Sequence, residues 1–330
     1  MSHDGQPTLL AEVIRNGFAE SRHYGVVSVM HGGVEIASAG LTSDAIFPRS
    51  ALKPLQLIAM LDAGLGSIDW SHEQLAVMAS SHSGQPEHIA AVRSILMKAG
   101  LVESQLQNTP GWPMDPAARH SLREQGITEK AAIFADCSGK HAAMLATCLI
   151  NDWSLQNYRA ADHPLQQRIA QVVSEFTRDS SDFVGVDGCG APLFSCTTTG
   201  LARSYAALLD AAQGSPAARV AQAMRANPSM VAGKGRDVTA AMVHVPGLIV
   251  KDGAEGVFAA ALIRPGDTAA TGIAIKIADG ASRPRATVLA QILSDLGVGD
   301  PAPEWARHAV LGGGRVVGQI QPALSLVWKP

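Results

Sequence analysis

The sequence predicts an α+β fold, layered like an α/β protein, in which strands from both ends of the chain share one antiparallel sheet. Two observations predict it: strand-like runs occupy the two terminal regions, and helical spacing dominates between them. The chain has 330 residues, 47% of them apolar, which is enough for a substantial core. We therefore expect one domain over residues 1–330, with a terminal-sheet subregion at about 1–55 and 236–330 and a helical subregion at about 56–235.

The N-terminal part favours strands. Thr8–Arg15 is an apolar-rich run typical of a leading strand. Val26–Met30 and Val34–Ala37 flank His31-Gly-Gly33. Two β-rich runs around a Gly-Gly turn predict a hairpin.

The middle of the chain favours helices. In the segment after Pro164, four apolar residues (Leu165, Ile169, Val172 and Val173) fall on one helical face. Similar spacing predicts helices, in whole or in large part, over residues 51–64, 72–80, 87–99, 131–150, 164–178, 201–213 and 216–226.

The last third returns to short β-like runs that Gly, Pro and Asp separate. The predicted strands are Met242–Val245, Leu248–Lys251, Gly256–Ile263, Gly272–Ile277 and a final stretch over Val316–Val327. A helix is expected over Arg283–Leu296.

Composition excludes several classes of function. The net charge is -3 and charged residues are 17%, so no basic surface for nucleic acid is expected. No apolar stretch is long enough to span a bilayer, and the polar N-terminus has no signal-peptide core. We expect a cytoplasmic protein with no membrane partner, in which the four cysteines are reduced thiols.

The first candidate catalytic pattern is Ser50-Ala-Leu-Lys53, between Pro48 and Pro54. Proline is tolerated in a first helical turn, so Ser50 is expected near a helix N-terminus with Lys53 one turn further on. A serine hydroxyl needs a base to become a nucleophile, and a lysine can be that base where its neutral form is favoured. Alone the pattern is weak, because an N-cap serine beside a solvated lysine has the same spacing.

A second cluster, Ser80–His88, follows an apolar helix and contains three serines and His82. It is compatible with an ordinary turn that caps the next helix, and also with a serine that faces a pocket. A third feature, Lys251-Asp-Gly, ends a predicted strand, from which a lysine can project into a cleft. An Asp-Gly hairpin with an exposed lysine is the alternative, and Lys276 is a rival candidate.

Two further motifs together suggest a metal site. Asp136-Cys-Ser-Gly-Lys-His141 places a thiol, an amine and an imidazole within five positions, and Asp187-Gly-Cys189 adds a carboxylate and a second thiol. Thiolates with a carboxylate and a nitrogen ligand suit tetrahedral zinc. The alternatives are a nucleophilic cysteine with His141 as its base, or two buried thiols beside a glycine-rich turn.

Together these segments resemble the Rhizobium-type, zinc-containing L-asparaginases (class 3, asparaginase II-like). The resemblance rests on five motifs that occur in the family's order over about residues 8–330: Phe47–Pro54, Ala79–Gly84, Cys137–His141, Asp187–Pro192 and Lys251–Gly256. It implies a fold like that of serine β-lactamases and glutaminases and a homodimer. It also implies an L-asparagine amidohydrolase that releases ammonia and aspartate by means of two Ser-Lys pairs.

The resemblance assigns residues to roles. The catalytic pairs would be Ser50 with Lys53 and Ser81 with Lys251, with Ser80 or Ser83 as alternatives for the second serine. Arg49 is a candidate for the substrate carboxylate because a guanidinium binds carboxylates in bidentate fashion, and His82 and Ser83 are further candidates for substrate contact. The implied zinc ligands are Cys137, Lys140, Asp187 and Cys189, with a structural or substrate-orienting metal and no organic cofactor.

Other functions remain open from the sequence alone. A glutaminase or another acyl-serine amide or lactam hydrolase would use the same groups. A zinc- or thiol-based sensor that binds an amino acid without turnover is a second alternative, although it would not need Ser-x-x-Lys.

Overall fold

The computed structural model describes residues 7–300 and 303–329. Residues 1–6, part of the polar N-terminus in which we expect no signal peptide, lie outside the described residues. The chain forms two units, and each is treated by itself below. The first contains the residues up to Ala51, Cys196–Asp210 and the residues from Ala240 on, and the second contains Leu52–Ser195 and Ala211–Thr239.

The first unit is built on one antiparallel sheet of nine strands within the described residues, in the order β11-β12-β1-β2-β10-β9-β8, with β3 paired to β2 and β13 to β3. These strands are β1 (Thr8–Arg15), β2 (Phe18–His31), β3 (Val34–Ala39), β8 (Ile249–Asp252), β9 (Val257–Leu262), β10 (Thr271–Ile277), β11 (Ala309–Gly312), β12 (Arg315–Pro322) and β13 (Val327–Trp328). β4 (Ala45–Ile46) and β7 (Cys196–Thr197) form a separate small pair. Strands from both ends of the chain therefore share one sheet, as the sequence predicts.

The long strand β2 joins the two ends of the chain. Its first half pairs with β1, and its second half pairs with β10 on one side and β3 on the other. Fourteen residues are needed for these pairings, and the predicted strand Val26–Met30 is only its buried end. The earlier half alternates exposed and buried residues, so its apolar signal is weaker.

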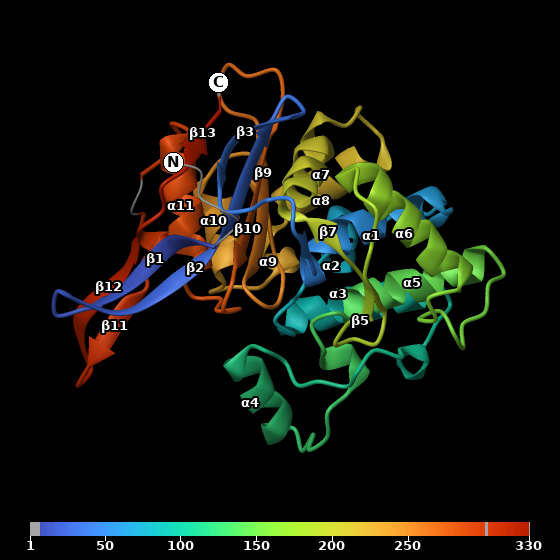
Figure 1. Cartoon of the computed structure of the whole chain (residues 1–330). Helices are drawn as coiled ribbons and strands as arrows, with labels where there is room; N and C mark the ends of the chain where they lie inside the picture. Colours follow the sequence, from blue (N-terminus) through green and yellow to red (C-terminus); the bar gives the residue numbers. More distant parts are fainter. Residues whose placement is uncertain (1–6, 301–302, 330) are drawn as a thin grey trace. The chain divides into compact units, whose positions relative to one another are not determined.

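Two helices of this unit, α7 (Thr198–Asp210) and α11 (Arg285–Asp295), lie on opposite sides of the sheet (Figure 1). α7 packs on β2, β9 and β10, and α11 packs near β1, β10 and β12. At Gly272 a Cβ atom would lie 2.0 Å from the Ala202 carbonyl oxygen, so α7 approaches β10 at a position that only glycine permits.

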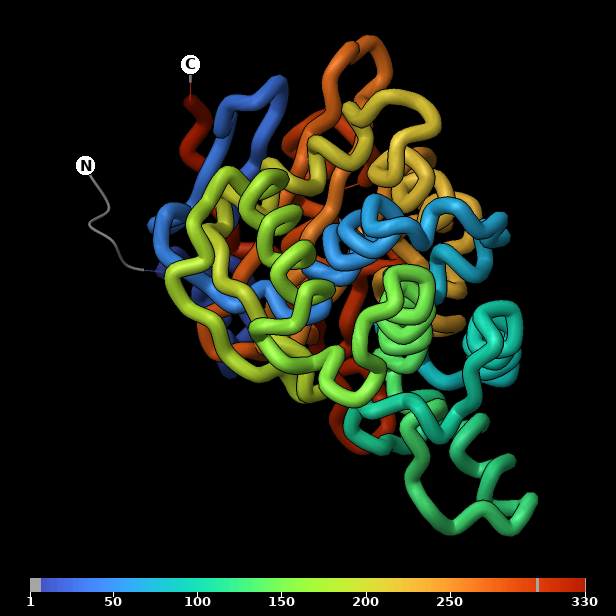
Figure 2. The backbone as a smooth tube through the Cα atoms, turned by 90° about the vertical axis from the view of Figure 1, so that its right-hand side faces the viewer, coloured from blue at the N-terminus to red at the C-terminus, as the bar shows by residue number. Residues whose placement is uncertain are grey.

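The second unit is mainly helical. Its helices are α1 (Lys53–Asp62), α2 (His72–Met78), α3 (Pro86–Lys98), α4 (Pro116–Glu124), α5 (Ser138–Ile150), α6 (Pro164–Thr177), α8 (Pro216–Ala226) and α9 (Pro228–Val231). The hairpin of β5 (Val184–Val186) and β6 (Pro192–Phe194) completes it. α5 is buried from Ser138 to Cys148 and packs against α1, α2 and α3, whereas α4 lies at one end of the unit (Figures 1 and 2).

The predicted α+β architecture, with its terminal antiparallel sheet and helical middle, is confirmed. One strand prediction is wrong: Met242–Val245 is not a strand, because α10 (Asp237–His244) covers most of it. The β-branched valines gave a local strand signal, but the helix buries Val238, Ala241 and Met242. The position of α7 also differs from the prediction: the sequence placed it in the helical subregion, whereas in the structure it belongs to the unit that contains the sheet. None of the helices in the described ranges is long and apolar enough to cross a bilayer.

Candidate active site and metal centre

The loop after α2 carries the Ser-Ser-His-Ser motif, and backbone hydrogen bonds hold it within the second unit. The Ser81 amide donates to the Val231 carbonyl at 3.0 Å, and the His82 amide donates to the Asp136 carbonyl at 3.1 Å. Ser80 to Gln85 are all buried although they form no helix or strand. A loop this constrained can present a side chain in a defined position.

Lys53 lies at the start of α1 and points at this loop. Its Nζ atom is 3.0 Å from Ser81 Oγ and 3.2 Å from Asp136 Oδ2. Lys53 is only 2% exposed and Ser81 5%, so the amine and the hydroxyl meet away from bulk water. Within the second unit the serine that contacts Lys53 is thus Ser81, and Asp136 is a partner that the sequence reasoning did not assign.

The other polar groups of the loop have structural partners. Ser80 donates to the Val77 carbonyl at 2.7 Å, and Ser83 donates to the Ala232 carbonyl at 2.8 Å. His82 is fully buried and accepts from the Gly84 amide with Nδ1, while its Nε2 lies 2.9 Å from Ser138 Oγ. Burial lowers the pKa of His82 to about 3, so the ring is neutral near pH 7.

Arg49, Ser50 and Lys251 belong to the first unit. Arg49 has a φ of 55°, a left-handed conformation that is uncommon for a residue with a side chain and often marks functional sites. Lys251 is completely buried at the end of β8, and its Nζ donates to Asp252 Oδ1 at 2.6 Å. Lys276, the rival lysine, is half-buried, and burial lowers its pKa.

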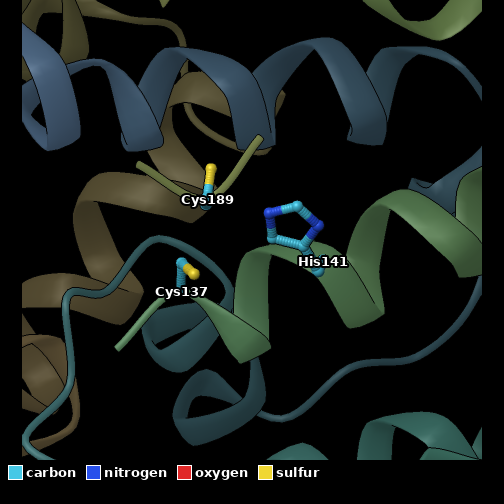
Figure 3. Close-up of side chains that lie close together, drawn as sticks. All are labelled: Cys137, His141 and Cys189. Atoms are coloured by element: carbon cyan, nitrogen blue, oxygen red, sulfur yellow. The ribbon is translucent and has the colours of Figure 1, made fainter. Parts of the chain in front are cut away.

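Two of the predicted metal ligands, Cys137 and Cys189, lie close to His141 in the second unit (Figure 3). The ligand atoms of Cys137, His141 and Cys189 all lie within 4.8 Å of one another, and all three residues are buried. Cys137 precedes α5 and His141 lies one turn along it, while Cys189 comes from the turn after β5. Lys140 Nζ is 3.2 Å from Cys189 Sγ, and Asp187 Oδ2 is 3.7 Å from the same sulfur.

The charges in this cluster favour a thiolate at Cys189. A hydrogen bond from Cys137 and the nearby Lys140 lower the pKa of Cys189 far below its usual range, although burial opposes this. The pKa of Cys137 is raised by the same hydrogen bond and by burial. Burial acts to lower the pKa of Lys140, but the neighbouring Cys189, Cys137 and Asp187 together outweigh it, so the pKa is raised.

The cluster fits a zinc ion. His141 Nδ1 lies 2.7 Å from the Tyr158 hydroxyl, whereas the fully buried His141 Nε2 has no hydrogen-bond partner within the described part of the chain. Histidine ligands of metals commonly use one ring nitrogen for the metal and the other for such a contact. Two thiols and an imidazole are donors that zinc prefers.

Comparison with protein families decides the class. The sequence model of the L-asparaginase II family matches residues 11–322. The chain belongs to the L-asparaginase II family. The family that the five motifs indicated is thereby confirmed. The individual roles assigned to Ser50, Lys53, Ser81, Lys251, Arg49, His82 and Ser83 stay predictions.

Solved structures similar to this L-asparaginase II chain include glutaminases, the class that the fold prediction named. The covalent complex of the Bacillus subtilis glutaminase YbgJ with 5-oxo-L-norleucine is 13% identical, with a TM-score of 0.40, over 87% of this chain and 92% of that chain. Mglu in its tris and glutamate form is 14% identical, with a TM-score of 0.36, over 89% of this chain and 63% of that chain. This chain thus spans less than two thirds of Mglu. No curated protein matches this chain.

Proposed function

We propose that this chain hydrolyses the side-chain amide of L-asparagine to L-aspartate and ammonia, with a serine nucleophile and a lysine base. The observation that carries the proposal is the buried contact of 3.0 Å between Lys53 Nζ and Ser81 Oγ. Family membership supports amide hydrolysis, and the contact supports this route to it. The sequence paired Ser50 with Lys53 and Ser81 with Lys251, whereas this contact joins Lys53 to Ser81. We therefore propose Ser50 and Lys251 as the second pair, and Arg49 as the residue that binds the substrate carboxylate.

The proposed reaction has two stages. Lys53, as the base, takes the Ser81 hydroxyl proton while Ser81 Oγ attacks the amide carbon. The tetrahedral oxyanion then collapses, the C–N bond breaks, and ammonia leaves with the proton that Lys53 returns. Water hydrolyses the resulting ester, which frees aspartate and Ser81. Asp136, 3.2 Å from Lys53, holds the amine in place between these steps.

Zinc is part of the proposal. Cys137, His141 and Cys189 would hold it, with Lys140 and Asp187 as the other predicted ligands, and it would order the segment that carries Asp136. From the resemblance to the Rhizobium-type L-asparaginases we also propose a homodimer, a cytoplasmic location and a role in asparagine catabolism.

Ammonia release from asparagine by zinc-replete protein tests the function. Ser81→Ala, Ser50→Ala and Lys53→Met should each lower kcat on the order of 10³-fold, because each removes a proposed nucleophile or base. Ser80→Ala is the matched control: the Ser80 hydroxyl donates to the Val77 carbonyl and has no proposed role in the reaction, so turnover should stay within a few-fold of wild type. Near wild-type turnover in Ser81→Ala or Lys53→Met would refute the proposed pair.

The same assay separates the alternatives. Glutamine and a β-lactam are tested beside asparagine, since a preference for either would identify a glutaminase or a lactam hydrolase. Binding of asparagine without ammonia release would instead favour an amino-acid sensor. A difference of one methylene in the substrate is worth only about 1–3 kcal/mol in a pocket, so both amides must be measured.

A further inference from the structure

Three charged side chains are buried together at the end of β8 in the first unit. Lys251 is 0% exposed, Asp252 7% and Arg285 6%. Lys251 Nζ lies 2.6 Å from Asp252 Oδ1, and Arg285 Nη1 lies 3.9 Å from Asp252 Oδ2. Burying ions is costly unless they are paired, so one carboxylate shared by two cations is an arrangement that needs a reason.

The position of Arg285 is unfavourable for its helix. Arg285 is the first residue of α11, where the helix dipole disfavours a cation. Its contacts lie elsewhere: Nη1 donates to the Gly253 carbonyl at 3.1 Å, and the guanidinium lies 5.1 Å from the centre of the Phe258 ring. Arg285 therefore clamps the turn between β8 and β9.

That turn lies against the segment that carries Ser50. A Cβ atom on Gly253 would come within 2.3 Å of the Pro48 carbonyl oxygen, which also accepts from the Ala51 amide. From α7, the Tyr205 hydroxyl donates to the Ala51 carbonyl at 2.8 Å. Within the first unit, the contacts of Arg285 thus hold the end of β8, which carries Lys251, beside the turn that carries Ser50.

The charges of Arg285 and Asp252 bear on the protonation of Lys251. Arginine is always protonated, so Arg285 attracts the Asp252 carboxylate at every pH at which the protein is folded. Within the described part of the first unit, the charged and titratable groups near Lys251 include Asp252 on its own strand, Arg285 of α11 and Tyr205 of α7, which faces Asp252. Burial, and then Asp252, raise the pKa of Tyr205, so this phenol stays neutral and adds no charge.

We propose that Arg285 is a positioning residue that shares the Asp252 carboxylate with Lys251 and thereby makes the Lys251 ammonium easier to deprotonate. This rests on the proposed function, in which Lys251 serves the second Ser-Lys pair. An unshared Asp252 would hold Lys251 as a cation, and a cation cannot accept a serine proton. Arg285 thus acts through Asp252 and touches no reacting atom.

The test compares the pH profile of kcat/KM for asparagine in zinc-replete, full-length variants. Arg285→Gln keeps a donor for the Gly253 carbonyl but removes the charge, so the acidic limb should move up by about one pH unit. Arg285→Lys restores the charge and should return the limb toward wild type. Asp252→Asn removes the anion and should move the limb down. Arg283→Gln, two residues away and exposed, is the matched control and should not move it.

A second readout needs no turnover. In the unfolded chain a lysine keeps its proton to about pH 10. If Arg285 eases deprotonation of folded Lys251, wild type gains stability relative to Arg285→Gln as the pH rises from 7 toward 10, measured by urea unfolding. Absence of ammonia release by wild type would reject the asparaginase proposal alone. The role of Arg285 would be rejected if the acidic limb of the pH profile were the same in Arg285→Gln as in wild type. It would also be rejected if the stabilities of the two proteins changed in parallel with pH.

Discussion

Two buried imidazoles show how single residues shape the site. His82 and His88 stack with ring centres 5.3 Å apart, and burial lowers the pKa of both. His88 accepts from the Gln85 amide and contacts the Ser229 carbonyl at 2.8 Å. Because both rings have internal partners, their evident task is to fix the Ser80–Gln85 loop. Substrate contact by His82 stays a prediction.

This burial has a consequence for acid stability. Folded His82 stays neutral down to a pH of about 3, whereas an unfolded histidine protonates near 6.5. The unfolded state therefore binds more protons between these values, and stability falls as the pH drops from about 6.5, by up to about 1.4 kcal/mol per pH unit. Urea unfolding of wild type and His82→Asn at pH 7.5 and 4.5 measures it. The variant should lose less stability, and an equal loss would contradict the assignment.

At the scale of elements, α5 connects the two parts of the candidate site. Its N-terminal turn carries Lys140 and His141, and the residue before the helix is Cys137. α5 crosses α2 so closely that a Cβ atom on Gly139 would lie 2.3 Å from the Val77 carbonyl oxygen. Since the Val77 carbonyl also accepts from Ser80, this crossing sets the distance between the Cys137–His141–Cys189 group and the Ser81 loop.

Gly139→Ala tests that crossing. The added methyl group has no room against backbone, so we expect a loss of about 2–3 kcal/mol in the free energy of unfolding and a lower zinc content. Gly100→Ala is the comparison: nothing lies within 4 Å of its Cβ position, and only its φ of 71° opposes a side chain, so it should cost about 1 kcal/mol. A Gly139→Ala protein as stable as wild type would show that α5 can shift.

At the scale of the molecule, the two units are interleaved along the chain. The second unit takes Leu52–Ser195 and then Ala211–Thr239, and the later segment supplies the Val231 carbonyl that fixes Ser81. Within that unit Cys137 and Cys189 belong to the same group of possible metal ligands, so a bound ion would close a long loop. Such a closure stabilises a fold by restricting its unfolded chain.

Zinc removal is therefore expected to affect the whole second unit. Elemental analysis should find one zinc per chain, and a chelator should lower the Tm by several degrees. Cys189→Ser and His141→Ala should lower the zinc content, while Cys148→Ala, which removes a buried thiol of α5 outside the cluster, should not. A fully active, metal-free preparation would exclude the zinc proposal.

The residues of the candidate site could be found in the sequence because each motif is short and local. Asp136 precedes Cys137 in a motif that the sequence had already singled out, so its part in the site could have been predicted. His141, in the same motif, was considered only as a possible base. Arg285 offered no signal: Gly253 and Asp252, the partners on which its proposed role depends, lie 32 and 33 residues away in the sequence. Arg236, 3.5 Å from Ser83 Oγ, was equally hidden.

The sequence alone determined the α+β class, the terminal sheet and most helices, because hydrophobic periodicity and turn residues act over a few positions. It also determined the family, through five motifs in order. Tertiary structure decided that Lys53 meets Ser81 and Asp136, that His141 joins the thiols, and that Met242–Val245 lies mostly in a helix. Those outcomes depend on which faces pack together, and packing overrides local preference because burial energies exceed propensity differences.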